Sequence, residues 1–328
     1  MLNRRGFIRV ASVSLATPAI FRATRALGAD WPTKPVRIVV PFVPGGSTDT
    51  TARIVGAKLS EIWGQPVVIE NRGGAGGNIA ADLVAKSDPD GYTIFIVGPG
   101  MATNQFLYQK LTYDPVNDFA PVSMLITQPN IMTVPNSSPA KTVKEFIDYV
   151  NSPEKKGKAT YGSSGIGTTL HLSGELFKYL THVELTHIAY KGGGPAINDL
   201  IPGRIDVTFD NAPSIFPHIQ AGEVSGIAVT TKQRVAVVPD LPPIAETVPG
   251  FDVSSWFAFF VPVKTPSEIV AQINAATVQA IKSDAVANKL KALGADPTSS
   301  TPAELAAFLK SEMDKWGPVI KAAGIKAE

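Results

Sequence analysis

Two loops rich in glycine and hydroxyl side chains carry the clearest chemical signal in this 328-residue sequence. Residues 41–49 read Pro-Phe-Val-Pro-Gly-Gly-Ser-Thr-Asp, and residues 161–169 read Tyr-Gly-Ser-Ser-Gly-Ile-Gly-Thr-Thr. Each loop lies between a segment typical of a strand and a segment typical of a helix, so unpaired backbone N–H groups are expected there. Adjacent glycines also let the backbone approach a ligand closely. Both loops therefore suit the binding of an anion.

The same loops also have a purely structural interpretation. Ser47, Thr48 or Asp49 could act only as the N-cap of the helix that follows. In the second loop, the hydroxyls of Ser164 and Thr168 could donate to a ligand oxygen or cap their own helix. The sequence leaves both roles open.

Charged candidates are fewer. A third glycine-rich loop adds Tyr190 and Lys191, and the lysine is either a ligand contact or a solvated loop residue. Asp206 and Asp210 are four residues apart on an expected strand, so they share one of its faces. They could form a catalytic carboxylate pair, although Asp210 beside Asn211 fits polar recognition better.

Motifs for catalysis and cofactor binding are missing from the sequence. It has no Gly-x-Ser-x-Gly elbow and no Walker loop, and the spacing after Gly165 and Gly167 departs from the dinucleotide pattern at Leu170. The four histidines lack the His-Glu-x-x-His spacing, and zero cysteines exclude disulfides, thiolate zinc sites and iron–sulfur clusters. We therefore expect no catalytic residue, no metal and no cofactor.

Composition and charge exclude further classes of protein. With 44% hydrophobic and 18% charged residues, the chain has enough apolar side chains for two ordinary lobes and is not disordered. The formal net charge is +2, but five arginines and no acidic residue fall within the first 29 residues, so the rest carries −3. A mildly acidic body without a basic tract offers no electrostatic surface for nucleic acid.

Residues 1–29 have the three parts of a secretory signal: a basic start, an apolar stretch over 10–21 and small residues near the end. The start, Asn-Arg-Arg-Gly-Phe-Ile-Arg at 3–9, is close to the twin-arginine export signature. The apolar stretch is too short to span a bilayer. A retained basic membrane anchor is the alternative. We predict a cleaved export signal and hence a location in the bacterial periplasm.

From residue 31 onward, short β-rich segments alternate with amphipathic segments of helical length, which predicts an α/β fold with largely parallel sheets. The first unit is expected to contain strands over 36–40, 67–69 and 93–97 and helices over 52–62 and 79–86. A second unit is expected to contain strands over 159–161, 185–190, 205–209 and 227–230, and helices behind Thr142, over 169–180 and after Pro195. Thr265 and Thr301, each followed by proline and a glutamate three residues on, predict two capped helices.

Two apolar, β-like runs, residues 121–135 and 253–263, could each cross from one lobe to the other. Two crossings make the first lobe discontinuous and leave a cleft between the lobes, where ligand sites concentrate. We place lobe 1 over 30–127 plus 252–328, and lobe 2 over 128–251.

Several motifs follow one another in a fixed order through the chain after the signal. They lie at 31–32 with 36–49, at 71–78 (Asn-Arg-Gly-Gly-Ala-Gly-Gly-Asn), 161–165, 190–193, 203–206, 255–257 and 261–262. In this order the motifs resemble those of the periplasmic solute-binding receptors of tripartite tricarboxylate transporters, also called Bug-type receptors. The signal departs in part, because Asn3 replaces the usual Ser or Thr.

The resemblance implies a two-lobe receptor of the type II periplasmic-binding-protein (Venus flytrap) kind, with two crossover strands, that closes on a small carboxylate. In this family the first two loops hold the carboxylate through backbone N–H groups, hydroxyls and ordered water. Carried over by position, the ligand-binding residues are Phe42, Gly45, Gly46, Ser47, Ser164, Gly165, Thr168, Thr169, Tyr190, Gly192, Gly193, Asp210 and Asn211. The loop over 98–104, which includes Met101, often contributes to ligand choice in relatives.

We therefore expect a periplasmic receptor, not an enzyme, that captures an aliphatic di- or tricarboxylate or an aromatic acid. It would act as a monomer and deliver the ligand to membrane transporter subunits. Two alternatives are an exported enzyme that acts on an organic acid and a ligand-sensing subunit of a signalling system. Phe42, Tyr190 and Met101 leave room for either an aliphatic or an aromatic acid.

Overall fold

The computed structural model describes residues 31–236, 238–322 and 324–327. The segment in which the signal peptide is expected lies outside the described residues, so the export signal stays a prediction. The elements given below all belong to one structural unit, Pro32–Glu328. Within the described chain, no helix combines the length and apolarity that a bilayer span requires.

The first part of the chain folds as strand, helix, strand, helix, strand, as its periodicity predicts. It contains β1 (Val36–Val40), α1 (Ser47–Trp63), β2 (Val67–Asn71), α2 (Asn78–Ala85) and β3 (Thr93–Val97). β1 pairs in parallel with β2 on one side and with β3 on the other. α1 ends because Gly64 adopts a left-handed φ of 64° and donates its N–H to the carbonyl of Ser60 at 3.0 Å.

A helix occupies part of the segment expected to be a loop over 98–104. α3 (Gly100–Leu107) begins after Pro99, and no side chain caps it. Its sequence therefore lacks the usual signals of a helix start. Burial of Met101, Ala102 and Leu107 stabilises it instead, so tertiary packing decides its conformation.

The middle of the chain begins with the long strand β4 (Phe119–Pro135). It continues through α4 (Val143–Val150), β5 (Thr160–Ser163), α5 (Thr169–Thr181), β6 (Thr186–Ala189), α6 (Gly193–Leu200), β7 (Val207–Asn211), α7 (Ala212–Gln220) and β8 (Val224–Val229). Thr142 and Glu145 form the expected capping box at the start of α4. α6 begins two residues before Pro195, earlier than expected.

The last part returns to helix after one strand. It contains β9 (Ser254–Pro262), α8 (Ser267–Lys282), α9 (Asp284–Ala292), the short β10 (Asp296–Pro297) and α10 (Pro302–Ala322). Thr301 caps α10 as predicted, because its hydroxyl accepts the N–H of Glu304 while the Glu304 carboxylate accepts the N–H of Thr301. The matching prediction for α8 is wrong: its N-cap is Pro266, and no side chain caps it.

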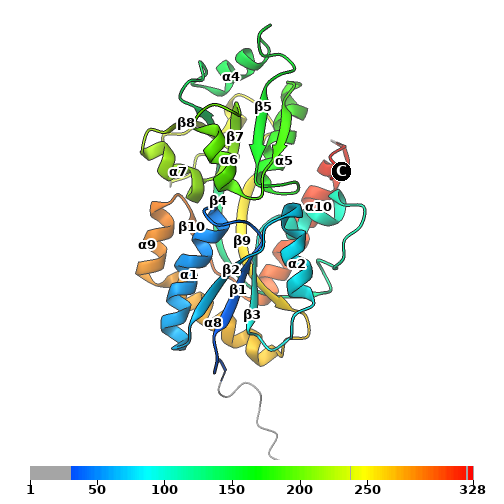
Figure 1. Ribbon diagram of the computed structural model, residues 1–328, viewed down its shortest axis with the longest axis vertical. Coiled ribbons are helices and arrows are strands. Elements are labelled where there is room, and N and C mark those ends of the chain that lie inside the picture. Colours follow the sequence, from blue (N-terminus) through cyan, green and yellow to red (C-terminus); the bar gives the residue numbers. More distant parts are fainter. Residues whose placement is uncertain (1–30, 237, 323, 328) are drawn as a thin grey trace, which may run out of the picture. The chain divides into compact units, whose positions relative to one another are not determined.

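The strands form one continuous hydrogen-bonded path in the order β2-β1-β3-β9-β4-β7-β5-β6, with β8 and β10 paired to β4. One end of β4 pairs with β9 and the other end with β7 and β8, so β4 runs through both halves of the path. In Figure 1 the green elements α4 to α7 gather around one end of β4, and the blue and orange elements around the other. We call these two groups the second and the first lobe; the exact boundaries stay a prediction.

Separate hydrophobic cores fill the two lobes. Phe146, Phe177 and Phe209 are central to the core of the second lobe, and Phe95 and Trp256 to that of the first. The apolar side chains of α10 touch both cores. Leu305 and Leu309 lie in the first core, and Trp316 and Ile320 in the second.

Candidate functional site

A cavity lies where loops of both lobes meet. The β1–α1 loop and the start of α1 contribute Pro41, Phe42, Gly46, Ser47 and Thr48 to the lining, and the β5–α5 loop and α5 contribute Ser164, Thr168, Thr169 and Leu170. The lining also includes Gly193 from α6, Asp210 and Asn211 from the end of β7, and Ser255 and Phe257 from β9. The remainder of the first lobe contributes Gly76, Gly77, Ala81, Phe95, Val97, Gly98, Pro99, Gly100, Met101, Asn104 and Tyr113. The cavity therefore draws on both loops that the sequence singled out.

Six helices, α1, α2, α3, α5, α6 and α7, begin at this cavity. Their first residues or N-caps line it: Gly46, Gly77, Gly100, Thr168, Gly193 and Asn211. Among them, only α5 has an N-terminus capped by a side chain. Their unpaired N–H groups and partial positive charges favour an anion, although no lysine, arginine or histidine is among the lining residues.

The β1–α1 loop is held in shape by Asp49. Its carboxylate accepts the N–H of Gly45 at 3.1 Å, the amide of Asn71 at 3.0 Å and two N–H groups of Arg53 at 2.9 and 3.0 Å. Burial alone would raise the pKa of Asp49, but these hydrogen bonds and the Arg53 charge hold it below its usual value. The alternative that Ser47 caps α1 does not hold, because Gly46 is the N-cap and the Ser47 hydroxyl donates to Gln128 at 3.1 Å.

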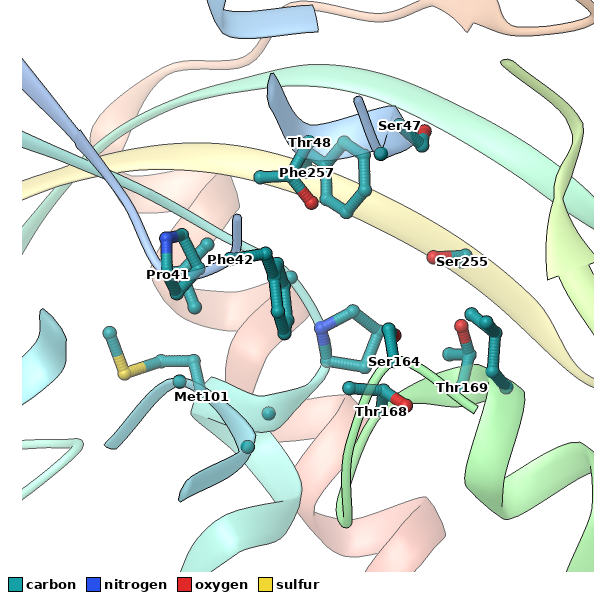
Figure 2. Close-up of a pocket in the computed structure, with 18 of the residues that line it drawn as sticks. Pro41, Phe42, Ser47, Thr48, Met101, Ser164, Thr168, Thr169, Ser255 and Phe257 are labelled. Atoms are coloured by element: carbon teal, nitrogen blue, oxygen red, sulfur yellow. The ribbon is translucent and has the colours of Figure 1, made fainter. Parts of the chain in front are cut away.

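In the β5–α5 loop, Thr168 fills the capping role that the sequence left open. Thr168 is the N-cap of α5: its hydroxyl accepts the N–H of His171 at 3.5 Å and donates to the carbonyl of Gly165 at 2.7 Å. Ser163 braces the loop from behind, with its hydroxyl 2.6 Å from Nε2 of His187. Ser164 and Thr168 lie on the cavity side, as Figure 2 shows.

Buried hydrogen bonds support the far wall. Asn211 donates to Oδ1 of Asn130 on β4 at 2.6 Å, and the Thr169 hydroxyl donates to the same oxygen at 3.4 Å. Asn130 in turn donates to Ser173 on α5 at 3.3 Å. These bonds tie β4, β7 and α5 together next to the cavity, so the wall is preorganised.

Asp210 is the one charged residue of the lining. Its Oδ1 accepts the Ser214 hydroxyl at 2.6 Å and the Asn211 N–H at 2.7 Å, while its Oδ2 is buried without a partner. Burial raises its pKa to about 6 in spite of these hydrogen bonds. Asp206 has different partners, because its carboxylate pairs with Lys155 and accepts the N–H of Thr160. The two aspartates therefore do not share a site.

The structure brings ten of the fourteen expected ligand-binding residues to the cavity lining. The exceptions are Gly45, Gly165, Tyr190 and Gly192. Tyr190 is tied to α6 instead, since its hydroxyl donates to Asp199 at 2.8 Å. The three glycines shape their loops rather than face the cavity: Gly45 donates its N–H to Asp49, for example, and has a left-handed φ of 96°. Contact of the other ten with a ligand remains a prediction.

Several lining residues were not predicted from the sequence. Phe95, Val97 and Tyr113 looked like ordinary core residues, because nothing in their spacing distinguishes a cavity wall from a packed interior. Asn104 fell within the 98–104 segment that the resemblance linked to ligand choice, although it lies on a helix, α3, rather than in a loop. Ser255 and Phe257 stood within one of the resemblance motifs, which was the only signal that could have identified them.

The described residues contain no cluster of three or more His, Asp or Glu side chains that could hold a metal ion. A two-lobe α/β fold, a cavity where both lobes meet, and helix N-termini in place of cations define the class of periplasmic solute-binding proteins.

Comparisons with known proteins identify the family. A family model described as the tripartite tricarboxylate transporter family receptor (TctC) matches residues 51–325. The structure of Rpa4515 from R. palustris with adipate is 43% identical, with a TM-score of 0.87 over 90% of this chain and 99% of that one. MatC from Rhodopseudomonas palustris with bound malate is 35% identical, with a TM-score of 0.83 over 88% and 100%. Protein BugT of Bordetella pertussis is 33% identical over 95% of this chain and 98% of its own length.

The chain therefore belongs to the TctC family of receptors, and its fold is that of a two-lobe periplasmic binding protein. The family consists of solute-binding receptors for tripartite tricarboxylate transporters. The expected family and fold are confirmed.

Proposed function

We propose that this receptor captures a small organic carboxylate between its lobes in the periplasm and passes it to the membrane subunits of a tripartite tricarboxylate-type transporter. The observation that carries this proposal is the meeting of six helix N-termini at a cavity whose lining has no cationic side chain. Such a site recognises an anion through backbone dipoles and hydroxyls. The adipate in Rpa4515 and the malate in MatC support a carboxylate as the ligand.

The strength of these contacts is sufficient for a transport receptor. Each hydrogen bond to a charged group contributes about 1.5–3 kcal/mol, and each helix N-terminus adds about 0.3–1 kcal/mol. Three or four such contacts reach the roughly 8 kcal/mol of micromolar binding after the cost of association. Because the ligand would touch both lobes, it would favour the closed state, and no catalytic residue is required.

Ligand-induced thermal stabilisation tests this function. The mature chain is screened against mono-, di-, tri- and aromatic carboxylates, with matched uncharged amides as controls. Gly46→Leu should abolish the shift, because a Cβ at Gly46 already lies 3.5 Å from the N of Gly193 and a larger side chain would hold the lobes apart. Thr168→Tyr should fill the cavity with the same result. Ala275→Leu, on the exposed face of α8, serves as the control. Unchanged shifts in both site variants would refute the site.

The alternatives give different outcomes. An exported enzyme would alter the bound acid chemically at a catalytic rate, which mass spectrometry of the recovered ligand detects. A sensing subunit would capture a membrane kinase rather than transporter subunits in a pull-down with ligand present. Light scattering tests the proposed monomer, and mass spectrometry of the periplasmic protein tests removal of the signal.

A further inference from the structure

The glycine-rich segment over 71–78 joins β2 to α2 and is fixed to the first lobe at both ends. At its start, the side-chain amide of Asn71 donates to the carbonyl of Phe42 at 2.9 Å. At its end, Oδ1 of Asn78 accepts the hydroxyl of Tyr113 at 2.7 Å. The glycines between these two ends are therefore held in a defined position on the first lobe.

The middle of this segment meets the β5–α5 loop of the second lobe, backbone against backbone. A Cβ atom at Gly76 would overlap the carbonyl oxygen of Ile166, and a Cβ atom at Gly165 would lie 3.3 Å from Cα of Gly76. The hydroxyl of Tyr108, which follows α3, is 3.2 Å from the carbonyl oxygen of Ala75 and 3.4 Å from that of Ile166. The two backbones can approach this closely because Gly76 has no side chain.

A second backbone contact between the lobes lies at Gly73. A Cβ atom there would be 3.0 Å from the N of Val43 and 3.3 Å from the carbonyl oxygen of Lys191, which precedes α6 in the second lobe. The N–H of Val43 donates to this carbonyl at 3.1 Å. A Cβ atom at Gly192 would lie 3.0 Å from Cγ2 of Val43. Glycines on both lobes therefore leave the space that this contact needs.

Both contacts join loops that separate when the lobes open. In the sheet, β2 is connected to β5 through β1, β3, β9, β4 and β7, so an opening about β4 and β9 moves the loops after β2 and β5 apart. The contacts therefore add their free energy to the closed state, whether or not a ligand is bound. The apparent affinity for a ligand rises with the fraction of chains in the binding-competent state. Such contacts can thus set the affinity without touching the ligand.

We propose that Gly73 and Gly76 form a clasp between the lobes, which stabilises the closed state and thereby raises the affinity for the ligand. The clasp comprises residues 73–76 of the first lobe and residues 165–166 and 191–192 of the second. This inference rests on the proposed function and deepens it, because it gives the glycine-rich segment a part in closure. Gly73 is outside the cavity lining, as a part in closure rather than in ligand contact requires.

Calorimetry with matched alanine variants tests the clasp, with adipate, malate and benzoate as probes. Gly76→Ala should weaken the binding of each acid that the wild type binds by about tenfold. The factor should be the same for each acid, because closure is common to all of them. Gly73→Ala, at a position without a left-handed φ, should weaken binding by about threefold.

Gly64→Ala is the control for backbone strain. Gly64 has a left-handed φ of 64°, close to the 60° of Gly76, but an added Cβ atom there meets no neighbouring group within 4 Å. The control should lower the stability of the fold and leave the affinities unchanged. Equal losses of affinity in Gly64→Ala and Gly76→Ala would overturn the proposal. A loss that differs from one acid to another would also overturn it, because it would indicate a direct contact with the ligand.

Distances between two spin labels measure closure directly. The sequence has no cysteine, so Lys86→Cys after α2 and Tyr179→Cys on α5 place one label at an exposed position of each lobe. The clasp segment leads into α2 and its partner loop into α5, so release of the clasp should lengthen the distance between the labels. Gly76→Ala should increase the longer-distance population, both with adipate and without any acid.

The two measurements separate the clasp from the proposed function. An unchanged distance distribution in Gly76→Ala would overturn the clasp, even if the affinity fell. No binding by any acid would refute the proposed function, and the distances in the ligand-free chain would still decide whether the clasp exists.

Discussion

At the scale of single residues, Asp210 is the charged side chain of the cavity lining, and its environment disfavours the ionised form. The carboxyl group is fully buried, its Oδ2 has no partner, and its pKa is raised to about 6 by burial. A carboxylate ligand and an ionised Asp210 would repel each other, so a raised pKa suits an anion site. The same burial destabilises the folded chain whenever Asp210 is ionised, because the unfolded chain ionises it freely.

This linkage predicts the effect of Asp210→Asn on stability. The folded pKa lies above the unfolded one, so the contribution of Asp210 to stability is fully present below pH 3.8 and is lost as the pH rises through about 6. The variant should therefore be more stable than the wild type at pH 7.5, by about 1–3 kcal/mol, and this gain should vanish near pH 4. Urea unfolding across this pH range measures it. A gain that does not change with pH would mean that ionisation of Asp210 is not the cause.

At the scale of elements, one local pattern has two outcomes. The sequences Thr-Pro-Ser-Glu at 265–268 and Thr-Pro-Ala-Glu at 301–304 look alike, but only Thr301 caps its helix. The Thr265 hydroxyl is buried and has no partner. Thr265 lies in a tight turn after β9, in which its N–H donates to the carbonyl of Pro262 at 3.0 Å, and α8 begins with Pro266 as its N-cap.

We expect removal of the hydroxyl to change the stability of the protein differently at Thr265 and at Thr301. Thr301→Ala should destabilise the protein by about 1 kcal/mol, because α10 loses its capping box. Thr265→Val should be neutral or stabilising, since it removes an unpaired buried hydroxyl and keeps the shape of the side chain. Thermal unfolding of both variants at neutral pH measures the difference. Equal losses of stability would show that Thr265 caps α8 in solution.

At the scale of the whole molecule, the loops of one lobe touch those of the other around the cavity. Val43 donates its N–H to the carbonyl of Lys191 at 3.1 Å, and the Thr103 hydroxyl donates to the carbonyl of Gly167 at 3.0 Å. Most of the polypeptide links between the lobes pass along β4 and the segment before β9, where the N–H of Val253 donates to the carbonyl of Thr230. Contacts between loops can thus break while the strands stay paired, which permits opening and closing.

Thr103→Val removes one of these contacts, together with the hydrogen bond from the same hydroxyl to the carbonyl of Pro99. The closed state should lose about 1 kcal/mol, which corresponds to a roughly fivefold weaker affinity for the ligand. Calorimetry measures the affinity, and small-angle scattering of the ligand-free chain should show a larger share of the open state. Unchanged affinity would mean that this hydrogen bond forms equally in both states.

Much of this protein is determined by the sequence alone. Alternation of strand and helix patterns predicted the α/β fold, and Gly64, Thr142 and Thr301 marked helix ends through local hydrogen bonds that need no distant partner. The two glycine-rich loops identified one end of the site for the same reason, because a strand that leads into a helix presents N–H groups at their junction.

Only the tertiary structure decided the rest. Packing stabilises α3, and the Tyr190 hydroxyl donates to Asp199 on α6. Part of the cavity wall is built from residues such as Phe95 and Val97, which look like any core residue in the sequence. Whether an apolar side chain packs against a neighbour or lines a cavity depends on the volume left between elements that are distant in the chain. The spacing of residues in the sequence does not report that volume. The two glycine-rich loops of the site could therefore be predicted from the sequence, and the apolar residues of the cavity wall could not.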